Sequence, residues 1–303
     1  MADPAVSVLV PTWNGAAHLA ACLESLLAQH FGDMEILVSD DCSSDSTPSV
    51  IREFAGRDAR IRWWVNERNV GMAGNFNSCL TQARGRFIKP LLQDDVLVDP
   101  SAIARMVAVL ESEPGVALVG CASILIDRRG VEIGRRHPFA EDRRIQGPRL
   151  IAACLERAEN IIGEPSLVMF RRAHAGVGLD ASFRQLIDLE LHFRLLEQGD
   201  FVYIDQVLAA FRRHEAQLSA LHARSDISLV ESRRLFEIWY RRESMRGVAT
   251  RAMLFTQLRR LKRYHASDSG AQQAELMRDL GRGWYAALWM RRRLERLLGR
   301  RTK

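Results

Sequence analysis

The sequence predicts an α/β fold, with an open, mostly parallel sheet, helices on both of its faces and a helical C-terminal extension. Three observations support this prediction. Short apolar, β-rich segments alternate with segments of helical apolar spacing through the first half of the chain. Polar clusters follow several expected strands, which is where parallel α/β sheets bind ligands. The 303 residues, 47% of them hydrophobic and 26% charged, suffice for one or two globular domains.

The expected elements of the first half alternate regularly. Its strands are apolar, as is typical of strands buried on both faces, and lie at 6–10, 35–39, 62–65 and 87–92, with 116–121 and 124–126 forming a pair around a bend. Its helices lie at 16–29, from Ser46 or Thr47 onward with Pro48 in the first turn, and at 69–83 and 100–112. This β-α-β order implies right-handed crossovers.

The second half is less regular. From about 127 to 146 arginines stand among turn residues, and we expect a mobile or irregular excursion. Helices are then expected at 150–157 and 188–198, and strands at 166–170 and 201–204. From about residue 225 the spacing is helical, in three helices broken near Gly247 and 267–270. We therefore expect a sheet domain at 1–223 and a helical region at 224–303.

Charge is unevenly distributed along the chain. The net charge is +6, but residues 231–303 carry 19 basic and 7 acidic residues, so the remainder is acidic by 6. No apolar run approaches the ~20 residues of a membrane-spanning helix, and no secretory signal is recognisable. Five widely spaced cysteines without a C-x-x-C pair indicate reduced thiols and a cytoplasmic location. Dinucleotide-binding and P-loop glycine patterns are absent.

Two acidic segments follow expected strands. The carboxylates of Asp94 and Asp95, after Gln93, can bind a hard divalent cation, or they are solvated residues of a turn. Asp40 and Asp41 end the second strand, where one carboxylate could accept a hydrogen bond from a nucleobase or ribose, or cap a turn or helix.

These segments belong to an ordered set. In chain order the set is 6–15 (VSVLVPTWNG), 35–47 (EILVSDDCSSDST), 69–71 (NVG), 83–88 (ARGRFI) and 93–95 (QDD). Together they closely resemble the N-terminal half of family 2 glycosyltransferases, which have the GT-A fold. The later segments 188–191 (DLEL) and 211–219 (FRRHEAQLS) extend the resemblance to about residues 5–220.

The resemblance implies a donor site. The nucleobase would be cupped by the loop of Pro11, Thr12 and Asn14 and would be bound by Asp41. The divalent cation, Mn2+ or Mg2+, would be held mainly by Asp95, because Gln93 occupies the first position of the family's D-x-D element. Asp94 would lie beside Asp95 at the metal- and ribose-binding end of that element. The remaining residues implied for the nucleotide sugar and the metal are Asn69, Asn75, and Arg212 and His214, which the family brings towards the metal and diphosphate.

The resemblance also implies an acceptor side. Asp188 stands where inverting members place the catalytic base, although Ile187 replaces the Glu that often precedes it, and the alternative for Asp188 is a helix N-cap. Glu164 would contact the acceptor, or it lies in a plain turn before a strand. The Asn-Phe-Asn segment from Asn75 to Asn77 resembles the corresponding segment of members that use deoxysugar donors such as dTDP-rhamnose. The alternative is that Asn75 only caps a helix or packs.

The implied reaction is an inverting transfer of a sugar from a UDP- or dTDP-sugar to a hydroxyl of a glycan or lipid-linked acceptor. A divalent cation would stabilise the leaving diphosphate, and an aspartate would take the proton of the attacking hydroxyl. Two alternatives stay open. One is a sugar-nucleotide-binding protein without catalysis. The other is a sugar-phosphate nucleotidylyltransferase. That class needs a glycine-rich, basic loop after the first strand, and residues 11–15 do not form one.

The basic C-terminal region has three interpretations. Its helices could simply pack with solvated arginines. They could lie on a membrane surface, since Trp284, Tyr285, Leu288 and Trp289 precede the basic run Arg291–Arg293. Nucleic-acid binding is disfavoured, because no recognisable motif for it is present. The expected location is cytoplasmic, with the option of a peripheral position at the inner face of the membrane.

Overall fold

A computed structural model describes residues 3–214, 217, 227–248, 251–263 and 277–297. The chain divides into two compact units. The first comprises residues 1–147 and 160–231, and the second comprises residues 148–159 and 232–303. The boundary expected between residues 223 and 224 lies outside the described residues.

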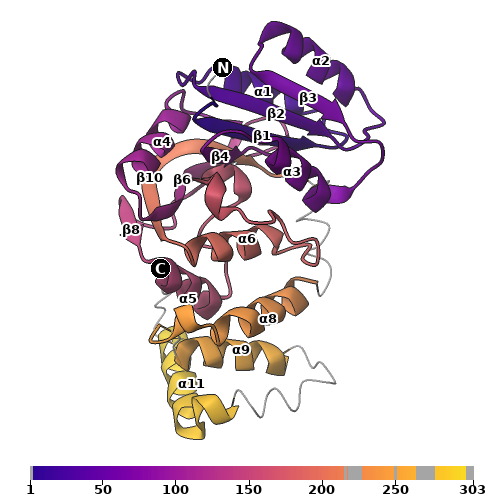
Figure 1. The fold of residues 1–303 in the computed structure, drawn as a ribbon. Coiled ribbons are helices and arrows are strands. Elements are labelled where there is room, and N and C mark those ends of the chain that lie inside the picture. Colours follow the sequence, from indigo (N-terminus) through magenta and orange to yellow (C-terminus); the bar gives the residue numbers. More distant parts are fainter. Residues whose placement is uncertain (1–2, 215–216, 218–226, 249–250, 264–276, 298–303) are drawn as a thin grey trace. The chain divides into compact units, whose positions relative to one another are not determined.

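The first unit is built on one mixed sheet (Figure 1). Its strands are β1 (Val6–Thr12), β2 (Met34–Asp40), β3 (Ile61–Val65), β4 (Phe87–Pro90), β5 (Val96–Leu97), β6 (Val116–Ile126), β7 (Glu132–Arg136), β8 (Arg143–Ile145), β9 (Val168–Arg171) and β10 (Asp200–Arg212). The order across the sheet is β3-β2-β1-β4-β9-β6-β10-β5, with β7 beside β6 and β8 beside β10. The first four strands in this order are parallel, and β9 is antiparallel to both of its neighbours.

Helices cover both faces of the sheet, as the sequence predicts; Figure 1 shows α2 and α3 on opposite sides of β1–β3. The helices assigned largely or wholly to this unit are α1 (Leu19–Leu27), α2 (Thr47–Arg57), α3 (Gly71–Gln82), α4 (Ala102–Ser112), α6 (Ile187–Leu196) and the short 3-10 turns η1 (Pro165–Leu167) and η2 (Arg172–His174). Every residue of β1 and β2 is buried. Their apolar runs form strands because both faces are packed against helices.

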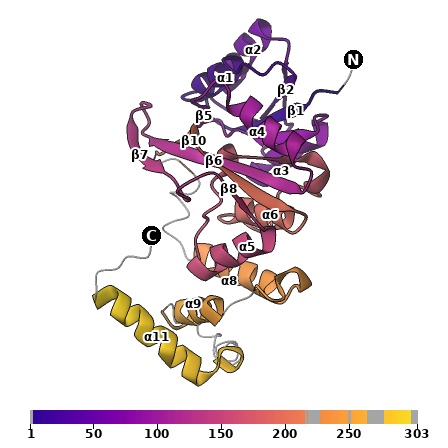
Figure 2. The same cartoon turned by 90° about the vertical axis from the view of Figure 1, so that its left-hand side faces the viewer.

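The strands after residue 115 differ from the expectation. The pair around a bend is one continuous strand, β6, and the excursion at 127–146 contains β7 and β8 (Figure 2). The strand expected at 201–204 extends to Arg212, since β10 continues through register shifts between Ile204 and Val207. Those irregularities interrupt the alternation that marks a strand in a sequence. The prediction of an irregular excursion at 127–146 was wrong for β7 and β8, and the rest of that segment is irregular, with turns and bends.

The second unit is helical. It contains most of α5 (Gly147–Arg157) and α8 (Ile227–Tyr240), and all of η3 (Glu243–Met245), α9 (Arg251–Arg263) and α11 (Arg282–Leu297). Aromatic contacts join its helices, with the rings of Phe255 and Tyr285 at 5.3 Å and the Arg251 guanidinium 4.5 Å from the Trp284 ring. Trp239 is fully buried. Side chains at 291–297 and all of 298–303 lie outside the described residues, so only part of the expected basic aromatic surface can be placed.

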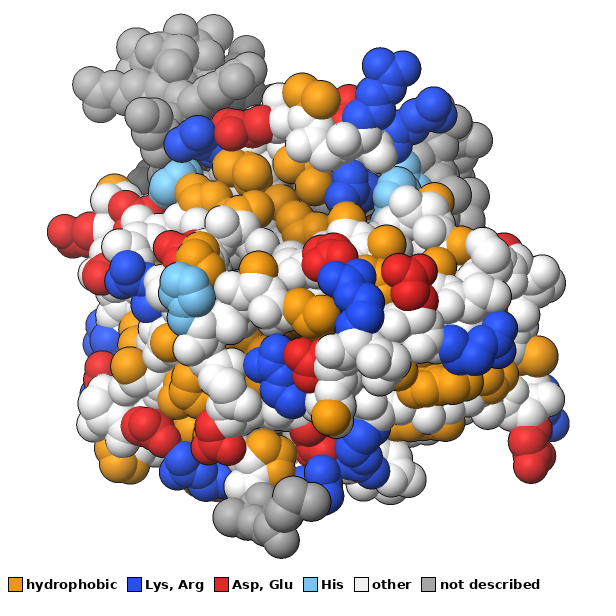
Figure 3. All heavy atoms as spheres, turned by 90° about the horizontal axis from the view of Figure 1, so that it is seen from above, with side chains coloured by type: hydrophobic (Ala, Val, Ile, Leu, Met, Phe, Trp, Pro, Cys, Tyr) orange, Lys and Arg blue, Asp and Glu red, His pale blue; other side chains and the backbone are white. Residues whose placement is uncertain are grey.

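Three properties follow from the described part of the chain. None of its helices is both long and apolar enough to cross a bilayer. On the face seen in Figure 3, acidic and basic side chains are interspersed. Among the cysteines, Cys22, Cys79, Cys121 and Cys154 are buried and Cys42 is exposed.

Candidate active site

The loops after β1 and β2 are hydrogen-bonded to each other. Because these parallel strands pair Thr12 with Asp40, both loops leave the same edge of the sheet. The backbone N–H of Asn14 donates to Ser43 Oγ at 2.8 Å, and Asn14 Oδ1 accepts from the backbone N–H of Ser44 at 2.9 Å. Asn14 has a φ of 46°, a left-handed conformation that Asn tolerates better than most residues. The two loops therefore form one fixed rim.

Gln93 ties the loop after β4 to the same rim. Its Oε1 accepts hydrogen bonds from Thr12 Oγ1 at 2.5 Å and from the Trp13 N–H at 2.8 Å, while its Nε2 donates to Trp13 O at 3.1 Å. A carboxylate has no proton to donate to that carbonyl, so an amide suits this position. Pro11 and Thr12 are buried, whereas the Trp13 side chain is 51% exposed. Trp13 is thus the residue of this loop whose ring could stack on a base, and the sequence analysis did not single it out.

Asp41 caps the start of α3. Its Oδ1 accepts from Asn66 Nδ2 at 2.9 Å and from the Val70 N–H at 2.8 Å, and its Oδ2 accepts from the Gly71 N–H at 2.8 Å. An ionised carboxylate has about four acceptor positions, so these contacts leave Oδ2 able to accept one more hydrogen bond. The helix-capping and nucleobase interpretations of Asp41 are therefore compatible.

The two expected asparagines lie beside Asp41 in different surroundings. Asn69 is exposed, and its Oδ1 accepts from the Gly71 N–H at 3.1 Å. Asn75 is buried, and its Nδ2 donates to carbonyl oxygens near the ends of β1 and β2 at 3.2 and 3.0 Å. Its Oδ1 accepts from Asn66 Nδ2 at 3.1 Å. Asn75 therefore supports the rim from beneath, and Asn69 is the more accessible to a ligand.

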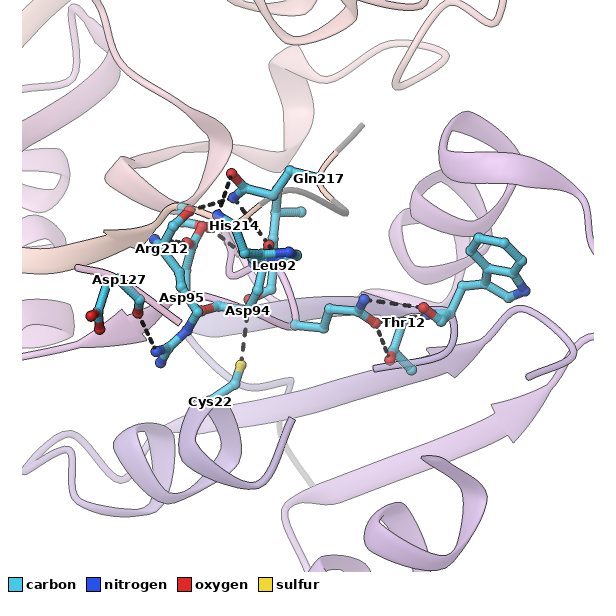
Figure 4. Close-up of polar contacts among 12 residues, drawn as sticks. Thr12, Cys22, Leu92, Asp94, Asp95, Asp127, Arg212, His214 and Gln217 are labelled. Atoms are coloured by element: carbon cyan, nitrogen blue, oxygen red, sulfur yellow. Dashed lines mark hydrogen bonds and ion pairs between the residues drawn. The ribbon is translucent and has the colours of Figure 1, made fainter. Parts of the chain in front are cut away.

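Asp94 and Asp95 face different partners (Figure 4). Asp95 is fully buried; its Oδ1 accepts from the Arg212 N–H at 2.9 Å, and its Oδ2 has no hydrogen-bond partner among the described residues. Asp94 Oδ2 lies 3.1 Å from His214 Nε2 and accepts from Gln217 Nε2 at 3.2 Å. The end of β10 thus brings His214 to the aspartate pair, where it contacts Asp94 directly.

Arg212 braces this turn. Its side chain is buried, with Nε donating to Asp94 O at 2.7 Å and Nη1 donating to Asp127 O at 3.0 Å. A guanidinium has five N–H donors, so these two contacts leave others for a diphosphate. The contacts hold the backbone of the aspartate turn in place.

The pKa values of the pair differ in direction. Burial, with the charge of Asp94 second, raises the pKa of Asp95 well above its usual value. Burial would also raise the pKa of Asp94, but hydrogen bonds from His214 and Gln217 hold that pKa below its usual value. The turn therefore carries one negative charge readily, and a second one when a cation offsets it.

These groups fit a divalent cation. The unpartnered buried oxygen of Asp95, the carboxylate of Asp94 and the imidazole of His214 suit Mn2+, and the oxygens alone suit Mg2+. Within the described part of the chain, no three His, Cys, Asp or Glu side chains are grouped as a complete metal site. A cation held here would need further oxygen ligands, such as water or a diphosphate.

His18 is a second imidazole at this turn that the sequence analysis missed. It precedes α1, and its ring lies 5.2 Å from that of His214. Burial, followed by the charges of Arg212 and His214, lowers the pKa of His18, so it is neutral near pH 7. A lone His before a helix gives no sequence signal. Its contact, His214, follows the end of β10 and lies almost 200 residues later in the chain.

Asp188 lies in the first turn of α6 and is not its N-cap, which is Leu186. Its carboxylate accepts a hydrogen bond from Asn160 Nδ2 at 3.2 Å. Burial raises the pKa of Asp188 to about 7, and the charges of Glu164 and Glu231 act in the same direction. A carboxylate with this pKa can accept a proton near neutral pH, as a general base must.

Glu164 acts electrostatically on both the aspartate pair and Asp188. Its charge contributes to the raised pKa of both Asp95 and Asp188. Its Oε1 is ion-paired with Arg136, from the end of β7, and its buried Oε2 has no hydrogen-bond partner among the described residues. The segment expected to be irregular therefore supplies Arg136 to this position.

Comparison with known proteins identifies the family. Residues 7–175 match the family described as Glycosyl transferase family 2. The chain belongs to this family. An uncharacterized protein of Mycobacterium tuberculosis (strain CDC 1551 / Oshkosh) is 32% identical over 225 residues, which cover 71% of this chain and 69% of that protein. The GalNAc(5)-diNAcBac-PP-undecaprenol beta-1,3-glucosyltransferase of Campylobacter jejuni is 43% identical over 96 residues, which cover 31% of each chain.

Two solved structures share the fold. TarS 1–349 of S. aureus, in complex with UDP-GlcNAc, superposes with a TM-score of 0.68 at 18% identity, covering 91% of this chain and 80% of that chain. The mannosyltransferase PcManGT of Pyrobaculum calidifontis, in complex with GDP-Man and Mn2+, gives 0.59 at 17% identity, covering 97% and 81%. The GT-A fold prediction is confirmed, and the chain is a glycosyltransferase of the kind that uses nucleotide-sugar donors.

Proposed function

We propose that this glycosyltransferase moves a sugar from a UDP- or dTDP-sugar to a hydroxyl of a glycan or lipid-linked acceptor, with inversion at the anomeric carbon. The proposed catalytic domain is the sheet domain, residues 1–223. The observation that carries the proposal is the presence, in one compact unit, of the aspartate pair beside His214 and of Asp188, a carboxylate that can accept a proton near neutral pH. Glu164 acts electrostatically on both Asp95, at the diphosphate side, and Asp188, whose pKa is raised to about 7.

The proposed steps assign roles to these residues. Trp13, Asn69 and the remaining acceptor position of Asp41 bind the nucleoside at the rim. Asp94, Asp95 and His214 would hold a divalent cation, which, when bound, stabilises negative charge on the departing diphosphate. Asp188 takes the proton of the acceptor hydroxyl as its oxygen attacks the anomeric carbon. One displacement by this route inverts the sugar.

The donor and the metal draw support from the relatives. TarS is described with UDP-GlcNAc, and PcManGT with GDP-Man and Mn2+. The structure adds no support to the deoxysugar interpretation of Asn75 and Asn77, because both side chains are hydrogen-bonded to backbone groups. Asn77 Nδ2 donates to Leu179 O at 2.9 Å, and Asn77 Oδ1 accepts from the Leu179 N–H at 2.8 Å.

The acceptor is proposed from chemistry and from one relative. The Campylobacter enzyme is named for a glycan linked through diphosphate to undecaprenol, which is a lipid. Association of the C-terminal helices with a membrane surface would bring the chain to such an acceptor. In α11, Trp284, Trp289 and Met290 are 51%, 44% and 54% exposed, and three arginines follow Met290 in the sequence. Aromatic side chains beside basic ones suit the headgroup region of an anionic bilayer.

The proposal is tested by a donor screen. Unfolding temperatures are measured with UDP-, dTDP- and GDP-sugars, each with Mn2+, with Mg2+ and with a chelator, since a bound ligand stabilises by mass action. The best donor is then incubated with oligosaccharide and lipid-linked acceptors, and the anomeric configuration of the product is read by NMR. Product of opposite configuration to the donor supports the proposal. Retained configuration, or binding of donor without any turnover, contradicts it.

A further inference from the structure

The start of α6 receives a carboxylate from α8. Glu231 is 6% exposed and its two oxygens accept three backbone hydrogen bonds, from Arg184 N–H at 2.6 Å, Gln185 N–H at 2.8 Å and Leu186 N–H at 2.8 Å. Glu231 lies in the same compact unit as α6. Among the described residues, all of its hydrogen-bond partners are these consecutive amides.

This contact substitutes for a missing helix cap. Leu186 is the N-cap of α6 and has no side chain that can accept a hydrogen bond. A carboxylate near the N-terminus of a helix is favoured by the helix dipole, and its hydrogen bonds to amides are charge-assisted. Asp188 follows Leu186 by two residues. The backbone that carries Asp188 is therefore held in place by Glu231.

We propose that Glu231 is a positioning residue for the catalytic base: it fixes the first turn of α6 and, through its negative charge, favours the protonated form of Asp188. This inference rests on the proposed function, in which Asp188 is the base. It also gives α8, beyond the matched family region 7–175, a part in catalysis.

Other groups facing Asp188 have different roles. Glu164 also favours protonation, but its charge is offset by the ion pair with Arg136. Asn160 donates a hydrogen bond to Asp188, which favours the ionised form. On α6 itself, Glu190 is paired with Arg194 at 2.9 Å. Glu231 is thus the carboxylate near Asp188 whose described partners are all backbone amides.

The experiment compares pH profiles of kcat for the wild-type chain and Glu231→Gln. The glutamine keeps one acceptor oxygen for the amides, loses the other and removes the charge. We expect the acid limb of the profile, set by Asp188, to move down by about half a pH unit, so that the fraction of plateau activity retained at pH 6 rises about two- to threefold. The control is Glu237→Gln, a half-exposed residue of the same helix paired with Arg233, which should leave the limb in place.

A second measurement does not depend on turnover. The carboxyl 13C resonance of Asp188 in the full chain, identified by its absence from Asp188→Asn, is titrated in the wild-type and Glu231→Gln proteins. A lower midpoint in Glu231→Gln supports the inference, and an equal midpoint in the folded variant overturns it. If Glu231→Gln does not fold, Glu231→Asp keeps the charge on a shorter side chain. Its kcat should fall without a change in donor KM, and an unchanged kcat overturns the positioning role.

Failure of the proposed function would look different. If Asp188→Asn retains near-normal turnover, Asp188 is not the base, and the inference falls together with that assignment. If Asp188→Asn is inactive and Glu231→Gln leaves both the limb and the 13C midpoint unchanged, the base assignment stands and only the role of Glu231 is overturned.

Discussion

The donor rim and the acceptor side of this active site are built differently. At the rim, Asn75, Asp41 and Gln93 are hydrogen-bonded to backbone groups of neighbouring strand ends and loops. On the acceptor side, Glu164 retains a buried oxygen without a described hydrogen-bond partner, and burial raises the pKa of Asp188 to about 7. The rim is therefore fixed by contacts within the chain, whereas the acceptor side holds Asp188, whose protonation changes near neutral pH.

The comparison predicts that removing the base has the largest effect. Asp188→Asn keeps the size of the side chain but cannot take a proton, so kcat should fall by about 10²- to 10⁴-fold while donor affinity stays nearly unchanged. Steady-state kinetics and calorimetric titration of the donor measure the two quantities. Asp58→Asn, which disrupts a pair with Arg60 at the end of α2, is the control and should leave kcat intact. Near-normal turnover would remove Asp188 from the mechanism.

A second variant tests the aspartate pair. Asp95→Asn retains an oxygen that accepts from the Arg212 N–H but loses the charge, so nucleotide diphosphate should bind about tenfold or more weakly in Mn2+. Binding in the presence of a chelator should change little, because the rim contacts are untouched. Isothermal titration under both conditions separates the two contributions. Equal loss with and without metal would assign Asp95 a purely structural role.

The stability of Asp188→Asn relative to that of the wild-type chain should depend on pH. The folded pKa of Asp188 is raised from 3.8 to about 7, so folding disfavours its ionised form. The wild-type chain therefore loses stability as pH rises from about 4 to about 7, by at most roughly 4 kcal/mol. Asp188→Asn lacks this penalty. Its unfolding temperature relative to wild type should increase over that pH range and level off above it, and a constant difference would contradict the raised pKa.

The smallest expected effect concerns the second unit. Replacing Trp284 and Trp289 together by Ser should reduce flotation with vesicles that contain anionic lipid several-fold. Transfer to a soluble acceptor should be unaffected, because neither residue belongs to the proposed site. Vesicles of neutral lipid provide the matched control. Equal flotation of variant and wild type would favour the interpretation of solvated, packed helices.

Much of the fold could be predicted because its signals are local. The apolar runs of β1 and β2 and the helical spacing of α1 lie within short segments. In contrast, β7 and β8 are largely exposed and carry few apolar residues, so their sequences show no strand pattern. They become strands because β6 and β10 offer edges for pairing.

The meeting of polar residues from the ends of β1, β2 and β4 at one edge follows from the sequence, because parallel strands place their carboxyl ends together. The partners of these residues are set by the tertiary structure. Gln93 clamps Trp13, His18 approaches His214, and Glu231 caps the helix of Asp188. Such contacts join residues 45 to almost 200 positions apart. Their energies depend on burial and geometry that no local pattern encodes.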